Sequence, residues 1–471
     1  MTFNLQELLL HETYDFDVVI STGTTGFAGK LNLSPKKITF KIMGERSEER
    51  NCPIGWEDRD QIICKYLNKT FILNGLTATS DQSIAVSYSP KLIGYFETSF
   101  DVNNVIYCPS DIFDEHSFYA LDIYSETVSQ WIGNTTTQQN LIFNARSNTH
   151  NKADAPELTE FIVDVDGFGR IGVGYNLSIY ASVSDFKSGV VFPPSLFLIF
   201  SGLKRGSEIR GLYDSMYNLL ALITGDELTV EKVRVRHLAL GFEPWGSLYY
   251  PTYIMPKRRK DSCIFLPLGK DLIFDTLALS SLPLDIFRHY YTLTKQEIGY
   301  WGKYLRYRRM TNVEERFLGY FRILEALCAQ KREYLDGDTL MRLANRVKPC
   351  LVRKFGNKRN VSAFIKGLPR YNSSKYNTEK CIQDFFMSIP SGITDMWQFT
   401  KKDIGDVCKL RNDITHANDY SISELEIERK SKFIEILLIF ALLAKVWVAF
   451  ETTGHVIDRF NGYHLVARRS R

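Results

Sequence analysis

The sequence KLRNDITHAN spans Lys409–Asn418 and lies between two helical patterns near the C-terminus. It places an arginine, an amide, a carboxylate and a histidine within six residues, from Arg411 to His416. The guanidinium of arginine carries a fixed charge and a planar set of donors that suits phosphate. The imidazole of histidine exchanges its proton near neutral pH. These two side chains are the minimum needed to cleave RNA without a metal.

Helical patterns flank this stretch on both sides. Apolar residues recur at helical spacing in residues 312–334, 338–355, 378–387, 400–417 and 423–454. Thr311 or Asn312 can cap the first helix, and Ser423 with Glu426 forms a capping box for the last. Pro349 is expected to kink or end the second helix. Residues 356–374 are polar, basic and typical of a loop, with at most a short helix around 361–365.

The last of these helices needs a separate test, because residues 433–450 are largely apolar and approach the length of a membrane span. They contain Glu435 and Lys445, however, and the preceding turns are highly charged. The apolar residues also form a stripe and do not surround the helix. The pattern therefore favours a bundle or dimer helix over a membrane span.

The N-terminal part has a different pattern. From residue 13 to about 206, short runs of alternating or β-branched residues are separated by Gly, Pro, Asn and Ser. Such runs predict an antiparallel sandwich or barrel. Residues 207–224 interrupt them with one helix, for which Ser207 is the expected N-cap and Gly225 the end. We therefore predict an α+β multidomain protein with a β-rich domain at 1–300 and an all-α bundle at 301–471.

Composition and charge limit the function classes. The chain has 471 residues, of which 44% are hydrophobic and 13% aromatic, so it is not globally disordered. Residues 301–471 hold 31 Lys and Arg against 19 Asp and Glu, whereas residues 1–300 hold 27 against 35. This asymmetry indicates either that the C-terminal part binds a polyanion or that it has a solvated basic surface.

The start of the chain and its cysteines bear on the compartment. Residues 1–10 lack the basic and apolar regions of a signal peptide. The eight cysteines are scattered without a C-x-x-C pair, which favours reduced thiols over disulfides or a zinc site. A cytoplasmic protein is therefore expected.

Short spacings arise by chance, and two here need an alternative explanation. Arginine and histidine five positions apart occur a second time at Arg459 and His464, with an aromatic residue after the arginine and a glycine between. We interpret that copy as unrelated to catalysis. Residues 167–172 match G-x-G-x-x-G, but a strand pattern follows where a dinucleotide site needs a helix. A glycine-rich hairpin is the better explanation.

The stretch Arg411–His416, with Asn412 beside the arginine, resembles the signature of the HEPN superfamily. The resemblance covers about residues 310–455 and includes a first helix with Glu325 on its apolar face. Residues 29–40 and 129–133 also resemble the N-terminal domain of ApeA-type antiphage proteins, which join a β-rich domain to a C-terminal HEPN domain.

The resemblance implies a metal-independent RNA endonuclease that needs no cofactor and leaves a 2′,3′-cyclic phosphate. Arg411, Asn412 and His416 would be its catalytic residues. We expect Lys409 to contact RNA. Glu325 would support the site or be a buried polar residue of the bundle, and Asp413 is a supporting candidate that better fits a capping or salt-bridge role.

Helix geometry limits how one chain can complete this site. Arg411 and His416 lie about 140° apart on an ideal helix, so their side chains converge poorly within one monomer. Either the long side chain of Arg411 spans this separation, or a two-fold dimer brings two copies of the motif together, as HEPN domains are understood to do.

The resemblance further implies a role in abortive antiphage defence. Expected partners are RNA, with tRNA as a candidate, a second copy of the chain, and a phage-derived trigger at the N-terminal domain. The alternative is a non-catalytic HEPN module that only binds RNA or a nucleotide.

Overall fold

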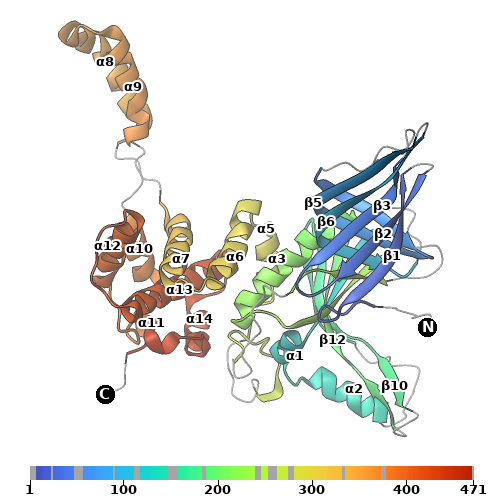
Figure 1. Ribbon diagram of the computed structural model, residues 1–471. Coiled ribbons are helices and arrows are strands. Elements are labelled where there is room, and N and C mark those ends of the chain that lie inside the picture. Colours follow the sequence, from blue (N-terminus) through green and yellow to red (C-terminus); the bar gives the residue numbers. More distant parts are fainter. Residues whose placement is uncertain are drawn as a thin grey trace. The chain divides into compact units, whose positions relative to one another are not determined.

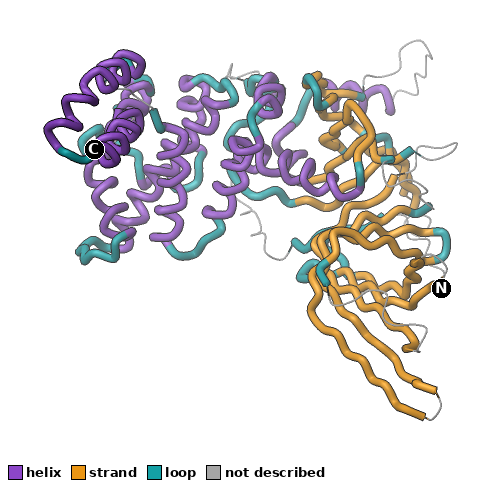
Figure 2. Tube along the Cα trace, turned by 90° about the horizontal axis from the view of Figure 1, so that it is seen from above, coloured by secondary structure: helices purple, strands orange, loops and turns teal. Residues whose placement is uncertain are grey.

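The computed structural model describes residues 7–22, 25–46, 57–88, 91–110, 117–146, 158–182, 187–238, 245–252, 263–273, 281–330, 335–372 and 378–468. The chain forms two compact units, one from Met1–Gly302 with Arg459–Asn461 and one from Lys303–Asp458 with Gly462–Arg471. Strands build most of the first unit and helices build the second (Figures 1 and 2). The predicted α+β class, with a barrel-like N-terminal region and a helical C-terminal region, is confirmed.

Six antiparallel strands close into a barrel at the start of the first unit. They are β1 (Tyr14–Thr22), β2 (Thr25–Leu33), β3 (Ile38–Arg46), β4 (Arg59–Tyr66), β5 (Lys69–Tyr88) and β6 (Lys91–Cys108). The ring closes because β3 pairs with β2 on one side and with β6 on the other. Alternate residues such as Leu31, Phe40 and Phe100 are fully buried, as the period-two pattern of the sequence requires.

An open antiparallel sheet continues from the end of β6. Its order is β14 (Trp245–Tyr249), β13 (Val230–His237), β7 (Phe118–Ser125), β12 (Pro194–Lys204), β9 (Gly169–Tyr175) and β8 (Thr159–Val165). Helix α1 (Glu126–Ile132) contacts β7, β12 and β13. Strands β10 (Ser178–Ser182) and β11 (Lys187–Val191) form a separate pair, and α2 (Thr136–Arg146) follows α1.

Two local predictions for this unit are confirmed, one of them with a different cap. Helix α3 (Gly206–Thr224) occupies the predicted segment and ends at Gly225 in the left-handed region, but its N-cap is Arg205. Glu208 accepts a hydrogen bond from the Arg205 backbone N–H, so the cap lies two residues before the expected Ser207. The glycine-rich stretch forms the β8–β9 hairpin, in which Gly167 and Gly169 have positive φ.

The remaining helices run from residue 285 to the C-terminus. They are α5 (Asp285–Thr292), α6 (Lys295–Arg308), α7 (Val313–Cys328), α8 (Gly337–Phe355), α9 (Lys358–Asn372), α10 (Thr378–Ser388), α11 (Ser391–Thr394), α12 (Asp403–Thr415), α13 (Glu424–Lys445) and α14 (Phe450–Val456). Two 3-10 turns, η1 (Ile457–Arg459) and η2 (Tyr463–Leu465), follow. Helices α7 and α13 pack closely, and α7 also contacts α10 and α12.

Helix caps were predicted better than helix ends. The side chains of Asn312 and Ser423 accept hydrogen bonds from the backbone N–H groups three residues ahead, as expected. Helix α7 ends at Cys328, before the predicted end. Helix α13 ends at Lys445, where the sequence predicted residue 454, because Trp447 turns the backbone into the left-handed region.

The segment between α7 and α10 differs from the sequence prediction in part. Pro349 was expected to kink or end its helix; it lies inside α8 and does not end it, because a proline removes one backbone hydrogen bond while the rest of the helix remains. Residues 358–372, expected to be mostly loop, form helix α9. The Asn357 side chain caps this helix by accepting a hydrogen bond from the Asn360 N–H at 3.0 Å, and this local signal outweighs the polar composition.

The core explains why α13 is so apolar. Its residues from Phe433 to Leu443 are buried inside the helical unit. Within the described part of the chain, no helix has both the length and the apolar content that a bilayer span requires. The basic run Lys257–Lys260, for which the sequence favours a solvated loop over an RNA contact, lies outside the described residues.

Candidate active site

Helix α12 carries Arg411 and Asn412 and ends next to His416. Ile404, Val407 and Leu410 are buried on one side of this helix and fix it within the bundle. Asp403 accepts hydrogen bonds from the Thr400 N–H and hydroxyl at 2.6 and 2.7 Å, which orders the entry to the helix. Arg411 directly follows the buried Leu410 and is therefore held at the edge of the buried face.

Arg411 contacts side chains of helix α7 and of its own helix α12. Its Nη2 donates to Glu325 Oε2 on α7 at 3.0 Å, and its Nη1 donates to Asn412 Oδ1 at 2.9 Å. The guanidinium carbon lies 5.4 Å from the ring centre of Phe321, also on α7. Thr378 at the start of α10 donates its hydroxyl to Glu325 Oε1 at 2.6 Å. Arg411 is thus oriented by a carboxylate that is itself held in place.

This arrangement leaves Arg411 able to bind an anion. A guanidinium has five N–H donors, and the two hydrogen bonds to Glu325 and Asn412 use two of them. The side chains of Arg411 and Glu325 are each 30% exposed. The Arg411 side chain is thus partly accessible to solvent and keeps N–H donors beyond those two hydrogen bonds.

His416 caps the C-terminal end of the same helix and its side chain is exposed. The chain reverses here: Asn418 N donates to Asp413 O at 2.9 Å and Ala417 N donates to Ile414 O at 3.3 Å. This is a Schellman motif, with Ala417 at φ +52° in the left-handed position that usually holds glycine. The imidazole makes no hydrogen bond to any described residue.

Asn412 and His416 are joined only through the backbone, where His416 N donates to Asn412 O at 2.9 Å. Asn412 instead uses its side chain to hold Arg411. The structure thus joins Arg411, Asn412 and Glu325 by hydrogen bonds and leaves His416 apart from them. That a second copy of the chain supplies part of the site therefore stays a prediction.

The two other predicted residues have different surroundings. Lys409 is exposed on the turn before Arg411. Asp413 Oδ1 accepts a hydrogen bond from Asn418 Nδ2 at 3.2 Å, which supports the reversal after the helix. Asp413 therefore acts on the backbone turn that carries His416, and Lys409 presents a charge to solvent.

A family model described as Apea-like HEPN matches residues 318–451, from within α7 to the start of α14. These residues form an Apea-like HEPN domain. The match contains the whole arrangement just described, including Glu325, Arg411 and His416. Searches of curated proteins and of solved structures found no match to the chain.

The core of this HEPN domain contains one buried charged cluster. Glu435 on α13 is 1% exposed and accepts hydrogen bonds from the hydroxyls of Tyr304 and Tyr320 at 3.0 and 3.2 Å. Burial raises its pKa, but Lys432 and Arg308 lower it more, so the pKa lies below its usual range. Both oxygens of the Glu435 carboxylate have hydrogen-bond donors, from Tyr304 and Tyr320 on one side and from Lys432 on the other, so the cluster has a structural role.

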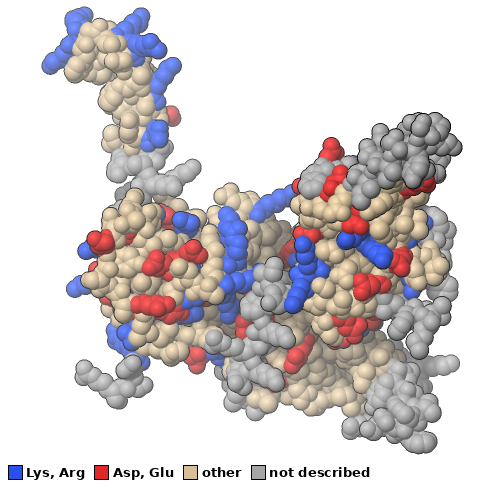
Figure 3. Space-filling view, in the orientation of Figure 1, with Lys and Arg blue, Asp and Glu red and all other residues tan. Residues whose placement is uncertain are grey.

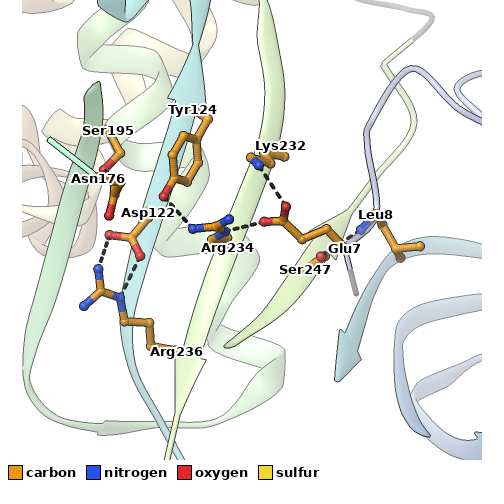
Figure 4. Close-up of polar contacts among 10 residues, drawn as sticks. All are labelled: Glu7, Leu8, Asp122, Tyr124, Asn176, Ser195, Lys232, Arg234, Arg236 and Ser247. Carbon is orange, nitrogen blue, oxygen red and sulfur yellow. Dashed lines mark hydrogen bonds and ion pairs between the residues drawn. The ribbon is translucent and has the colours of Figure 1, made fainter. Parts of the chain in front are cut away.

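A second polar cluster, in the first unit, was not identified from the sequence. The basic residues Lys232, Arg234 and Arg236 alternate along β13 and share one face of the open sheet (Figure 4). Arg236 forms two hydrogen bonds to Asp122, at 2.7 and 2.9 Å, although Asp122 is only 2% exposed. Burial raises the pKa of Asp122, while Arg236 opposes this shift.

The same face holds the N-terminal segment. Glu7 forms ion pairs with Lys232, at 2.8 Å, and with Arg234, and Leu8 N donates to Ser247 Oγ at 3.0 Å (Figure 4). The alternation of basic residues in β13 was a visible signal. Its acidic partners lie more than 100 residues away, so the sequence alone did not show that these charges are internally paired.

Among the described residues, no group of three or more His, Cys, Asp or Glu is arranged to hold a metal ion. The candidate site consists of Arg411, Asn412, Glu325 and His416. A guanidinium can stabilise negative charge, and an imidazole can transfer a proton.

Proposed function

We propose that this protein is a metal-independent RNA endonuclease of the HEPN class that acts in antiphage defence. The observation that carries the proposal is the oriented Arg411 at the edge of α12, held by Glu325 and Asn412, with an exposed histidine at the end of the same helix. Its occurrence in an Apea-like HEPN domain supports the assignment.

The proposed reaction is an internal transesterification of RNA. The ribose 2′-oxygen forms a bond to the adjacent phosphorus as its proton passes to one histidine, His416. The bond from phosphorus to the 5′-oxygen breaks, and that oxygen takes a proton from a second side chain, which acts as the general acid. The products are a 2′,3′-cyclic phosphate and a 5′-hydroxyl. Arg411 stabilises the additional negative charge on the phosphorane with its remaining N–H donors.

The general acid is proposed to be His416 of another copy of the chain. One histidine cannot both accept and donate a proton on opposite sides of the phosphorus in the same step, and His416 is not joined to Arg411 by hydrogen bonds within one chain. A two-fold dimer through the helical domain supplies the second imidazole by symmetry. Lys409, exposed on the same helix, is proposed to contact the RNA backbone.

The β-rich domain is proposed to respond to a phage-derived trigger and to restrain the nuclease in its absence. Its position before an Apea-like HEPN domain supports this role. Cleavage of tRNA or other cellular RNA would then arrest the infected cell. The proposal therefore includes an abortive-infection role in the cytoplasm.

The test is cleavage of bulk cellular RNA by purified full-length protein in excess EDTA, with sequencing of the RNA 3′ ends. We expect cyclic-phosphate ends with wild type, and their loss with His416→Ala and with Arg411→Ala. His464→Ala, which changes the duplicated spacing at Arg459, is the matched control and should retain activity. RNA binding without cleavage by wild type, or unchanged cleavage by His416→Ala, would show that the domain is a binding module or that the site lies elsewhere.

A further inference from the structure

The feature that the proposed site does not explain is the helical hairpin formed by α8 and α9, residues 335–372. These 38 residues contain nine Lys and Arg and only two acidic residues, a net charge of +7. Residues 301–471 as a whole have a net charge of +12, so this short segment provides more than half of it. Figure 3 shows Lys and Arg side chains along the hairpin.

The hairpin is closed at its base and is helical on both sides. The Asn372 side chain accepts a hydrogen bond from Leu335 N at 2.9 Å and donates one to Leu335 O at 2.7 Å. Val361 and Ile365 are buried between the helices. Among the described residues, no carboxylate forms an ion pair with any of the nine basic side chains. Their charge is therefore available to an external anion.

The turn of the hairpin forms a pocket of about 560 Å³, within the range of small-molecule sites. Its lining residues are Leu351, Phe355, Asn357, Asn360, Val361 and Phe364. Phe355 and Phe364 are 68% and 57% exposed, which is unusual for two aromatic rings that face one pocket. Asn357 uses its side-chain oxygen to cap α9, and the amide of Asn360 forms no hydrogen bond with a described residue.

Basic residues adjoin the pocket on both sides of the turn. Arg353 and Lys354 come directly before Phe355. Lys358 and Arg359 lie between the two asparagines that line the pocket. Exposed aromatic rings stack on unpaired bases, amides bind base edges, and Lys and Arg bind phosphates. All three kinds of group occur here within twelve residues.

We propose that the α8–α9 hairpin is an RNA-binding module that takes an unpaired base between Phe355 and Phe364 and binds the adjacent phosphates through basic residues of the turn. The proposal rests on the nuclease function proposed above and names its substrate class as RNA with a single-stranded segment. A base within a duplex is stacked on both faces, so it does not reach such a pocket. The concave, amide-containing pocket favours RNA over a lipid surface, which would need only a smooth apolar stripe.

The test measures binding by full-length His416→Ala protein, so that it does not depend on cleavage. The probes are a fluorescein-labelled U12 oligonucleotide and a 12-base-pair RNA duplex. We expect Phe355→Ala combined with Phe364→Ala to weaken U12 binding about 5- to 150-fold, the range for loss of one stacked base, with little change for the duplex. Leu343→Ala combined with Tyr371→Ala removes exposed apolar side chains of the same hairpin outside the pocket, and should bind as wild type.

A charge variant tests the phosphate contacts separately. Lys354→Gln with Lys358→Gln should make the slope of log K against log salt for U12 less steep by about 1.4, the value for two phosphate contacts on a single strand. Lys30→Gln with Lys65→Gln removes two exposed charges from the β-rich domain and should leave the slope unchanged. Asn360→Ala, which leaves the apolar contacts intact, should weaken U12 binding about fivefold through one lost hydrogen bond.

Three results would overturn the proposal. The first is wild-type affinity for U12 in both the pocket and charge variants, each with unchanged helicity by circular dichroism. The second is a pocket variant that changes the oligomeric state without changing RNA affinity, which would identify a protein interface. The third is sedimentation of the protein with vesicles containing phosphatidylserine, lost in the pocket variant while RNA binding remains. Hairpin-dependent binding by a protein that never cleaves RNA would instead contradict only the nuclease function.

Discussion

Replacement of Glu325 by alanine tests how the candidate site is built. The carboxylate accepts a hydrogen bond from Arg411 at 3.0 Å and another from Thr378 at 2.6 Å. If its role is to orient the guanidinium, then its loss should slow RNA cleavage without removing the charge that stabilises the phosphorane. The alternative is that Glu325 competes with the phosphate and restrains the enzyme.

The magnitude follows from the exposure of the pair. A buried hydrogen bond to a charged group contributes about 1.5–3 kcal/mol. Both side chains here are 30% exposed, so solvent screening reduces the value to about 1 kcal/mol. That energy changes the fraction of correctly oriented Arg411 about fivefold. We therefore expect Glu325→Ala to slow cleavage about fivefold, against roughly 10²- to 10³-fold for Arg411→Ala, which removes the stabilising group itself.

The assay is single-turnover cleavage of a labelled RNA by wild type, each single variant and the double variant. Because Glu325 is expected to act only through Arg411, its replacement should have no further effect in the Arg411→Ala protein. Glu325→Gln, whose amide oxygen still accepts a hydrogen bond, should lie between wild type and Glu325→Ala. Glu315→Ala is the matched control, since it removes an exposed carboxylate from the same helix.

Three results would refute this reasoning. Cleavage faster than wild type in Glu325→Ala would identify the carboxylate as a restraint on Arg411. An equal slowing by Glu325→Ala in the presence and absence of Arg411 would show that it acts by another route. A loss of unfolding free energy well above 1 kcal/mol would point to a structural role and not to orientation.

Two further predictions concern stability and its dependence on pH. Arg236→Met leaves the buried Asp122 without its partner and should lower the free energy of unfolding by about 3 kcal/mol at pH 7. Because burial already raises the pKa of Asp122, the loss of unfolding free energy should be smaller at pH 5 than at pH 7. An equal loss at pH 5 and pH 7, measured by urea unfolding, would contradict this. Burial raises the pKa of Glu435, but Lys432 and Arg308 bring it below its usual 4.5. Its charge therefore stabilises the fold above about pH 4.5, and this contribution is lost as pH falls through the lowered pKa. Wild type should lose more stability than Glu435→Gln between pH 5 and pH 3, as measured by thermal unfolding.

Sequence patterns predicted those features that depend on a few neighbouring residues. The caps at Asn312 and Ser423 and the helix α12 follow from hydrogen bonds and apolar spacing within one or two turns. Helix ends were less accurate, because they depend on where packing stops. Helix α13 ends at Lys445 although the apolar pattern continues, since the backbone turns at Trp447.

The candidate site could be located from the sequence but not assembled from it. Arg411, Asn412 and His416 are close in the chain, and Glu325 was selected because it lies on an apolar helix face. Only the fold joins Glu325 to Arg411 across 86 positions and separates His416 from both. Helix α8 was predicted, but helix α9 was missed because its polar composition resembles a loop, whereas its cap and internal packing decide that it is helical.

The sequence by itself determined the composition of each domain, most local helices and the candidate site residues near Arg411, because those properties depend on residue type and short-range spacing. The tertiary structure alone decided the closure of the barrel through the pairing of β3 with β6, the internal pairing of the charges on β13, and the orientation of Arg411 by Glu325. Each of these joins residues far apart in the chain, and no local pattern specifies which distant partner a strand or a charged side chain will meet.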